Sequence, residues 1–228
     1  EKKIIKIIGK NNISPVNINV PGDPSSAAFF TALTLLNKNS AIKIKNVGLN
    51  PTRIGFYELL KKQGANIKFN NLRKENNELR GDIFVKSSKI KPIKASKKYY
   101  VKSTDEYPIL FIIAALTKGI STFKGIGDLA NKESNRIKEM QKILKQVDIK
   151  SVSSGNELKI FGKEKIDIKG KKIIVPNLGD HRICMSSFVL SILLGSKILI
   201  KNFETVYTSS PSFLNIMKLL GVKFEIRK

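Results

Sequence analysis

The chain has 228 residues, 41% of them apolar, and its 42 Lys and Arg against 18 Asp and Glu give a formal net charge of +24. That apolar fraction is enough to bury a sizeable core, so a disordered basic tail is excluded. The single cysteine, Cys184, excludes an intrachain disulfide, and with His181 as the only histidine a metal site built from His and Cys is also excluded.

The sequence predicts neither a membrane span nor a leader peptide. Its longest apolar runs, residues 109–116 and 188–194, are far shorter than the ~20 residues that a span requires. The first residues, EKKIIKIIGKNN, lack the apolar core and the cleavage site of a signal peptide. We therefore expect a soluble, cytoplasmic protein, and the single cysteine suits a reducing compartment.

Only six of the basic residues are arginine, and the lysines are spread over the whole chain. A nucleic-acid-binding protein is expected to cluster its basic residues, to interleave aromatic residues and to use arginine for bidentate contacts. The pattern therefore favours a compositional bias over a nucleic-acid partner. A non-catalytic basic module that binds RNA or another polyanion stays an alternative.

Along the chain, one pattern of elements occurs three times. Each copy begins with an apolar helix and continues with a strand that a serine opens (Ser40, Ser121 and Ser196). An amphipathic helix and a β-branched strand follow. The first helices are apolar on nearly all sides, which is typical of helices buried on several faces. We expect an α/β fold of three repeated units with the helices inside.

Strands are predicted where short β-branched segments lie outside those helices. The predicted segments are 67–69, 82–86, 148–152, 157–161, 171–175 and 197–201. The polar stretch Asn70–Gly81 between the first two is expected to be a loop. Residues 1–20 do not fit the repeat and are interpreted as the end of a preceding unit.

Polar clusters stand where four helices are expected to begin. They are PGDPSSAAF (21–29), STDEYP (103–108), NKESNR (131–136) and GDHR (179–182). Capping a helix N-terminus is one explanation for their Asp, Ser, Thr and Asn residues. The candidate caps are Asp23, Ser25, Ser26, Thr104, Asn131 and Asp180.

Capping does not explain the cations in two of these clusters. Lys132 and Arg136 form an i,i+4 like-charge pair in an expected first turn, and Arg182 closely follows Asp180 in another. The helix dipole disfavours each cation there by about 0.3–1 kcal/mol, so we infer an anion that shares these side chains and the free N–H groups. Glu133, expected about 60° round the helix from Arg136, would then serve as an acid or base; a local ion pair is the alternative.

Asp105 and Glu106 precede a strongly apolar helix. A carboxylate at such an edge is partly desolvated, which raises its pKa toward that of a useful base. Capping remains the alternative for Asp105, and an ordinary first-turn position is favoured for Glu106. His181 is interpreted as structural and Cys184 as an inert core thiol.

Six motifs, in chain order, resemble the C-terminal half of the 5-enolpyruvylshikimate-3-phosphate synthases: VPGDPSSAAFF, GLNPTR, DEYPILFIIAAL, KESNR, GDHRICMS and TSSPSFLNIMKLLG. The resemblance implies an inside-out α/β domain of the enolpyruvyl transferase type, built from repeated βαβαββ units with buried helices. Family members have two such domains. Residues 20–228 then form the C-terminal domain, and residues 1–19 are a terminal strand or crossover from a preceding N-terminal domain that is absent.

The resemblance also implies a reaction. The enolpyruvyl group of phosphoenolpyruvate is transferred to the 5-hydroxyl of 3-phosphoshikimate and phosphate is released, on the shikimate pathway to chorismate and aromatic amino acids. The reaction proceeds by addition and elimination, without a metal or organic cofactor. The expected partners are the two substrates and the missing N-terminal domain, without which the chain is expected to be inactive. The family is usually monomeric.

By motif, the resemblance gives roles to five residues. Asp105 matches the aspartate that binds the shikimate ring hydroxyls and serves as base. Glu133 matches the glutamate that relays protons at the methylene carbon of phosphoenolpyruvate. Lys132 matches a lysine that contacts 3-phosphoshikimate. Arg136 and Arg182 match arginines that bind phosphoenolpyruvate, chiefly its carboxylate.

Three positions depart from the family pattern. Asn135 replaces an aspartate whose charge would help to hold Arg136, Ala130 replaces an arginine, and Thr208 replaces a lysine that contacts phosphoenolpyruvate. The nearest alternative activity is that of the sister enolpyruvyl transferase acting on UDP-N-acetylglucosamine, which has the same fold. The motifs DEYP, KES and DHR argue against it.

Overall fold

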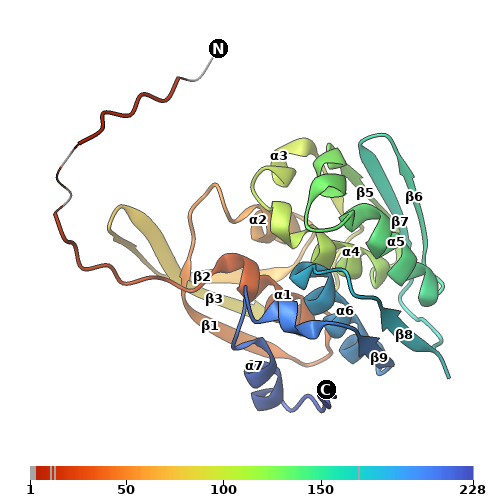
Figure 1. The fold of residues 1–228 in the computed structure, drawn as a ribbon. Helices are drawn as coiled ribbons and strands as arrows, with labels where there is room; N and C mark the ends of the chain where they lie inside the picture. The colour runs from red at the N-terminus through yellow and green to blue at the C-terminus, as the bar shows by residue number, and fades with distance from the viewer. Residues whose placement is uncertain (1–3, 11, 13, 169, 228) are drawn as a thin grey trace.

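Three apolar helices form the centre of the fold in the computed structural model, which describes residues 4–10, 12, 14–168 and 170–227. They are α1 (Pro24–Leu36), α4 (Tyr107–Ala115) and α6 (His181–Leu194), and each contacts the other two. Every residue of α4 is buried, because its sequence is apolar on all faces. The predicted α/β fold with buried helices is confirmed (Figure 1).

Each central helix is followed by a strand. These strands are β1 (Ala41–Gly48), β5 (Gly119–Lys124) and β9 (Lys197–Ile200). Ser40 and Ser196 stand directly before β1 and β9, as predicted. Ser121 lies inside β5 instead, where its Oγ accepts a hydrogen bond from the backbone N–H of Ile93 at 2.9 Å.

The second repeat contains the full βαβαββ order. Its elements are β4 (Lys94–Ala95), α4, β5, α5 (Arg136–Gln146), β6 (Lys150–Ser154) and β7 (Glu157–Gly162). They form a four-stranded sheet of order β4-β5-β7-β6, in which β4 runs parallel to β5. In the third repeat, β8 (Lys172–Val175) runs parallel to β9. The other helices and 3-10 turns are α2 (Gly55–Lys62), α3 (Lys97–Tyr100), η1 (Thr104–Glu106), η2 (Gly127–Asn131), η3 (Phe203–Val206) and α7 (Phe213–Leu219).

The loop predicted over Asn70–Gly81 is wrong, because β2 (Asn66–Glu75) and β3 (Glu78–Lys86) continue through it as a hairpin. Asn76 and Asn77 make the turn with φ angles of 49° and 62°, a left-handed conformation that asparagine tolerates. Most of β2 is exposed, so apolar alternation does not mark the strand in the sequence. With β1, the hairpin forms a sheet of order β1-β3-β2.

The described residues between 4 and 20 carry no helix or strand and extend away from the body of the fold (Figure 1). Arg80 of β3 anchors the point where this segment joins the body. Its buried guanidinium donates from Nη2 to the backbone oxygen of Asn19 at 2.8 Å. That residues 1–19 end a preceding domain stays a prediction, and residues 1–3, 11 and 13 lie outside the described part.

The outer sheet comes very close to the end of α4 at Gly162 of β7. A Cβ atom at this position would lie 2.0 Å from the backbone oxygen of Thr117 and 2.1 Å from that of Ala114. Only glycine fits such a contact, so this residue fixes the distance between the sheet and the C-terminal end of α4. Within the described ranges, no helix has both the length and the apolar character needed to cross a bilayer.

Candidate active site

Two arginines and three carboxylates meet where η1, α5 and α6 begin. Arg136, the first residue of α5, lies at the centre and its side chain is fully buried. Its Nε donates to Oδ2 of Asp180 at 2.9 Å, and its Nη2 donates to Oε2 of Glu133 at 2.6 Å. Its Nη1 lies 3.5 Å from Oδ1 of Asp105. We call these four residues and Arg182 the arginine–carboxylate cluster.

Asp180 holds two parts of this cluster together. It is fully buried and caps α6 as predicted, because its Oδ1 accepts from the backbone N–H groups of Arg182 at 3.0 Å and Ile183 at 3.3 Å. Its Oδ2 accepts from Oγ of Ser134 at 2.9 Å as well as from Arg136. One carboxylate therefore fixes the start of α6 and neutralises the buried guanidinium.

Arg182 has hydrogen-bonding capacity that the described residues do not use. Its side chain is 8% exposed, and its Nη2 lies 3.4 Å from Oδ2 of Asp105. Its Nε and Nη1 are buried without a hydrogen-bond partner in the described part of the chain. A buried donor without a partner costs about 1–3 kcal/mol, and an anion that accepts from either atom would reduce that cost.

The helix start predicted around Lys132 is wrong. Because α5 begins at Arg136, Lys132 and Glu133 lie before the helix and not in its first turn. Lys132 forms an ion pair with Asp128, with 3.2 Å between Nζ and Oδ2, and not a like-charge contact on the helix. Glu133, expected about 60° round that helix, reaches Arg136 from the preceding loop. Of the two cations, Arg136 is the one that stands at the start of α5.

Asn135 explains why α5 begins late. Its side-chain oxygen accepts a hydrogen bond from the backbone N–H of Lys138 at 3.0 Å, so it is the N-cap that was expected at Asn131. The amide thus performs the capping that an aspartate would perform, and the side chain of Arg136 next to it is fully buried. Thr208 is exposed and donates to the backbone oxygen of Thr205 at 2.8 Å.

The other candidate caps differ in outcome. Asp23 caps α1, accepting from the backbone N–H of Ser26 at 2.8 Å, whereas Ser25 and Ser26 are inside the helix. Thr104 caps no helix, because its hydroxyl donates back to the backbone oxygen of Tyr100 at 2.9 Å. Asp23 and Asp180 therefore play the same capping role, one exposed and the other buried.

The desolvated carboxylate predicted at the start of α4 is Glu106 and not Asp105. The side chain of Asp105 is 44% exposed, whereas Glu106 is 2% exposed and accepts a hydrogen bond from Oγ of Ser25. Burial raises the pKa of Glu106 to about 7, while the Ser25 hydrogen bond and the charge of Arg182 act to lower it. The available signal in the sequence was its place directly before an entirely apolar helix.

The remaining titratable groups near the cluster fit structural roles. His181 is half-buried at the start of α6, and burial and the neighbouring Arg182 charge lower its pKa, so the ring is neutral at pH 7. Burial raises the pKa of Cys184 to about 12, which keeps its thiol protonated and unreactive. In the described part of the chain, no group of three or more His, Cys, Asp or Glu side chains is placed to hold a metal ion.

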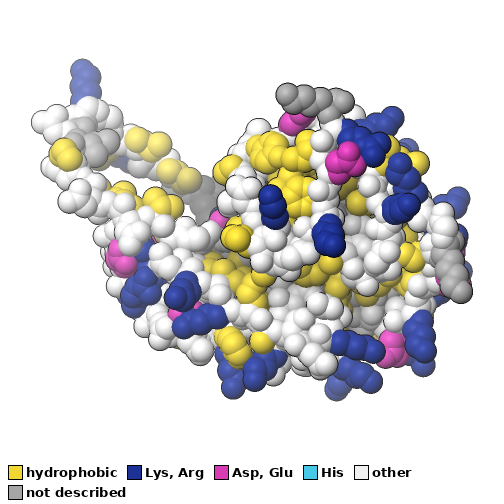
Figure 2. All heavy atoms as spheres, turned by 90° about the horizontal axis from the view of Figure 1, so that it is seen from below, with side chains coloured by type: hydrophobic (Ala, Val, Ile, Leu, Met, Phe, Trp, Pro, Cys, Tyr) yellow, Lys and Arg dark blue, Asp and Glu magenta, His cyan; other side chains and the backbone are white. Residues whose placement is uncertain are grey.

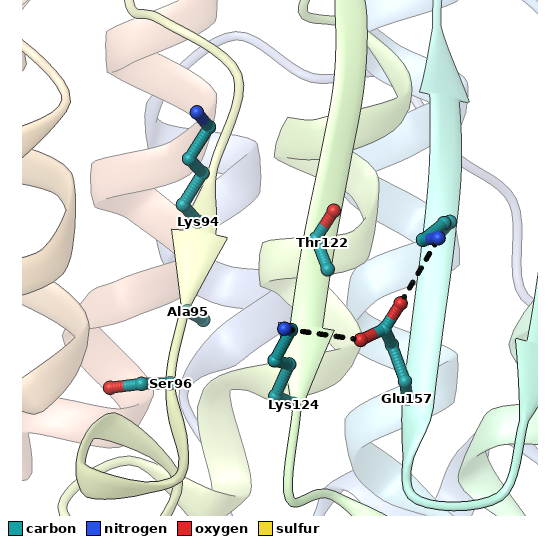
Figure 3. Close-up of a pocket in the computed structure, with 7 residues that line it drawn as sticks. Lys94, Ala95, Ser96, Thr122, Lys124 and Glu157 are labelled. Atoms are coloured by element: carbon teal, nitrogen blue, oxygen red, sulfur yellow. Dashed lines mark ion pairs between the residues drawn. The ribbon is translucent and has the colours of Figure 1, made fainter.

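A depression of about 410 Å³ on the four-stranded sheet shares no residue with the cluster (Figure 3). It is lined by Lys94, Ala95, Ser96, Thr122, Lys124, Glu157 and Lys159. Glu157 pairs with Lys124 at 3.7 Å and with Lys159 at 3.3 Å.

On the face of the molecule that Figure 2 shows, the Lys and Arg side chains are dispersed and do not form one basic patch. Lys94 therefore offers a control cation outside the site.

The fold and the cluster define an inside-out α/β domain with paired arginines and carboxylates at its helix N-termini. Over residues 1–217 the chain matches the family described as EPSP synthase (3-phosphoshikimate 1-carboxyvinyltransferase). A relative of that name from Zymomonas mobilis is 38% identical over 226 residues, which are 98% of this chain and 50% of the relative. Another from Petrotoga mobilis is 40% identical over 199 residues, covering 87% of this chain and 45% of the relative.

The same match is found in three dimensions. A solved structure of EPSP synthase from Acinetobacter baumannii superposes with a TM-score of 0.84 at 32% identity, covering 96% of this chain and 50% of that one. The chain therefore belongs to the EPSP synthase family. It spans about half the length of the curated relatives it matches.

Proposed function

We propose that this chain is the C-terminal half of an enzyme that transfers the enolpyruvyl group of phosphoenolpyruvate to the 5-hydroxyl of 3-phosphoshikimate and releases phosphate. The observation that carries the proposal is the arginine–carboxylate cluster, in a chain of the EPSP synthase family. The reaction requires groups that hold an anion and groups that move protons at adjacent atoms, and the cluster contains both kinds.

The two arginines bind the carboxylate of phosphoenolpyruvate in this proposal. Arg182 offers its buried Nε and Nη1, which have no hydrogen-bond partner in the described part of the chain. Asp180 holds Arg136 in place, and the Nη1 of Arg136, buried without a hydrogen-bond partner in the described part of the chain, is the donor it offers to a ligand. Planar guanidinium groups match carboxylate geometry, and both donors lie at a largely desolvated place.

The proton steps are assigned to Asp105 and Glu133, whose side chains are 44% and 43% exposed and so within reach of a substrate. Asp105 binds the shikimate ring. It takes the proton of the 5-hydroxyl while the oxygen of that hydroxyl forms a bond to C2 of phosphoenolpyruvate. Glu133 delivers a proton to the methylene carbon during addition and removes one during elimination, when the C2–O bond to phosphate breaks. Lys132 contacts 3-phosphoshikimate.

The proposal includes a preceding N-terminal domain that supplies the other substrate-binding groups. Without it the chain positions neither substrate completely, so we expect no turnover by this chain alone. We further propose a cytoplasmic monomer that uses neither a metal nor an organic cofactor and binds no nucleic acid. The single buried thiol suits a reducing compartment, and the dispersed lysines do not favour a nucleic-acid surface.

Binding of phosphoenolpyruvate in the presence of 3-phosphoshikimate tests the anion site. We expect Arg182→Gln to weaken binding about tenfold or more, because it removes a buried positive charge and its hydrogen-bond donors, whereas Lys94→Gln changes it less than about twofold. Equal losses in the two variants would favour a non-specific basic surface and contradict the proposal. Retained binding in Arg182→Gln would contradict the role of this arginine.

A further inference from the structure

Glu106 is a buried carboxylate that the proposed reaction leaves without a role. It caps no N–H group of α4 with its side chain, although it stands directly before the helix. Instead, its carboxylate turns toward α1 and accepts from Oγ of Ser25, which also accepts from Nη2 of Arg53 at 3.3 Å. Only 2% of Glu106 is exposed. The residue next to it, Asp105, contacts both arginines of the cluster.

The groups that act on Glu106 come from every element around it. From α6, the positive charge of Arg182 favours the ionised carboxylate, and from α1 the Ser25 hydroxyl does the same. The negative charge of Asp105 in η1 opposes ionisation. Tyr57 of α2 and Tyr107 of α4 are buried nearby, and their phenol pKa values are raised, so both stay neutral. The charge of Arg182, which belongs to the anion site, is therefore one of the influences on the ionisation of Glu106, after burial and the Ser25 hydrogen bond.

An anion held by Arg182 changes this balance. The bound negative charge offsets the guanidinium charge that stabilises ionised Glu106, while burial continues to penalise ionisation. The carboxylate then takes up a proton from solvent at pH values where it would otherwise be ionised. Coupling between two sites is reciprocal. Ionisation of Glu106 must therefore weaken anion binding at Arg182 by the same factor by which the bound anion strengthens proton binding at Glu106.

We propose that Glu106 is a proton-uptake residue coupled to the anion site: an anion binds at Arg182 more tightly when the Glu106 carboxyl is protonated. The inference rests on the proposed function only in taking Arg182 as an anion-binding residue. It adds a residue that sets how affinity depends on pH without touching the ligand. The affinity falls as pH rises through about 7, the pKa to which burial raises this carboxyl.

The test follows the ¹³C signal of the side-chain carboxyl carbon (Cδ) of Glu106 in this chain by NMR. The pH is varied between about 5 and 9, with and without saturating sulfate. Sulfate is the probe because its charge is constant over that range. The signal is assigned by through-bond correlation with the backbone resonances of Glu106, and binding at Arg182 is followed by its Nε–H resonance. We expect sulfate to raise the titration midpoint by about half a unit or more.

Two variants separate the coupling from a general effect of pH. Glu106→Gln is expected to abolish the roughly threefold loss of sulfate affinity between about pH 6 and pH 8. Ser25→Ala removes a hydrogen bond that favours ionisation, so its midpoint moves upward even without sulfate. Lys94→Gln, the control, keeps the sulfate-induced shift. His181 stays in all variants, so its titration cancels in the comparison.

The outcomes distinguish this inference from the proposed function. Sulfate binding at Arg182 with an unmoved Glu106 midpoint overturns the coupling and leaves the anion site intact. Retention of the full pH dependence in Glu106→Gln overturns it equally. Absence of any sulfate effect on the Arg182 resonance overturns both the coupling and the anion site. If Glu106→Gln does not fold, the Ser25→Ala midpoint and the sulfate-induced shift in the unaltered chain still decide the question.

Discussion

Replacing Asp180 with alanine removes two interactions at once, and the structure allows them to be separated. Asp180 accepts two backbone N–H groups at the start of α6, and it is the fully buried partner of Arg136. Loss of an N-cap costs about 1 kcal/mol, and removing the partner of a buried charge costs about 3–5 kcal/mol, of which the remaining contacts of Arg136 with Glu133 and Asp105 recover a part. We expect Asp180→Ala to lower the free energy of unfolding by about 3 kcal/mol or more.

Asp23 provides the matched control. It caps α1 in the same way, but its side chain is 43% exposed and its ion pair with Arg53 spans 3.4 Å at the surface. Such exposed pairs contribute about 0–1 kcal/mol, so Asp23→Ala should cost about 1 kcal/mol, nearly all of it from the cap. The difference between the two variants therefore isolates the buried charge of Arg136.

Urea unfolding at about pH 7, followed by circular dichroism, measures both losses. Asp180→Asn is included because it keeps a capping oxygen and removes only the charge, so its loss should fall between those of the two alanine variants. If Asp180→Ala cost no more than about 1 kcal/mol beyond Asp23→Ala, the reasoning that Asp180 neutralises a buried guanidinium would be refuted.

Three further predictions concern stability and reactivity. Gly162→Ala should lower the free energy of unfolding by about 3 kcal/mol in urea titrations, because its Cβ would meet the backbone oxygens of Thr117 and Ala114; an unchanged midpoint would contradict the close contact. Glu106 binds its proton more tightly when folded (pKa about 7 against 4.5), so the free energy of unfolding should fall by about 3 kcal/mol as pH rises from about 4.5 to 7. Urea titrations across that range should show the fall in the unaltered chain and not in Glu106→Gln. If the free energy of unfolding changed equally with pH in both, the raised pKa of Glu106 would be contradicted. Cys184 should react with an aromatic disulfide reagent only after unfolding, and rapid labelling of the native chain would contradict its burial.

The centre of the fold was predictable because apolar residues on every face of a helix require burial on every face. The apolar residues of α1, α4 and α6 are enough to predict these as buried helices without any knowledge of their neighbours. The β2–β3 hairpin was not predictable in this way, since its exposed polar residues carry no apolar alternation. Its turn depends on two consecutive asparagines in a left-handed conformation, a local preference that the polar composition around them concealed.

The site was predicted in part for a similar reason. Cations at helix starts conflict with the helix dipole, and this conflict pointed to Arg136 and Arg182. Lys132 was placed on the helix because Asn131 and Asn135 are both good caps, and only the observed hydrogen bond to Lys138 selects the second. Glu106 was undervalued because its burial depends on α1 covering it, which local sequence does not show.

The most direct test is phosphate release from phosphoenolpyruvate, measured on a protein in which this chain follows the proposed N-terminal domain. We expect release that depends on 3-phosphoshikimate and that UDP-N-acetylglucosamine does not support. Glu133→Gln should abolish the release, and Lys94→Gln should leave it intact. If no phosphate is released with either acceptor, the catalytic assignment is contradicted and a protein that only binds anions is favoured. Release in Glu133→Gln equal to that of the unaltered protein would contradict the proton relay at the centre of the proposed site.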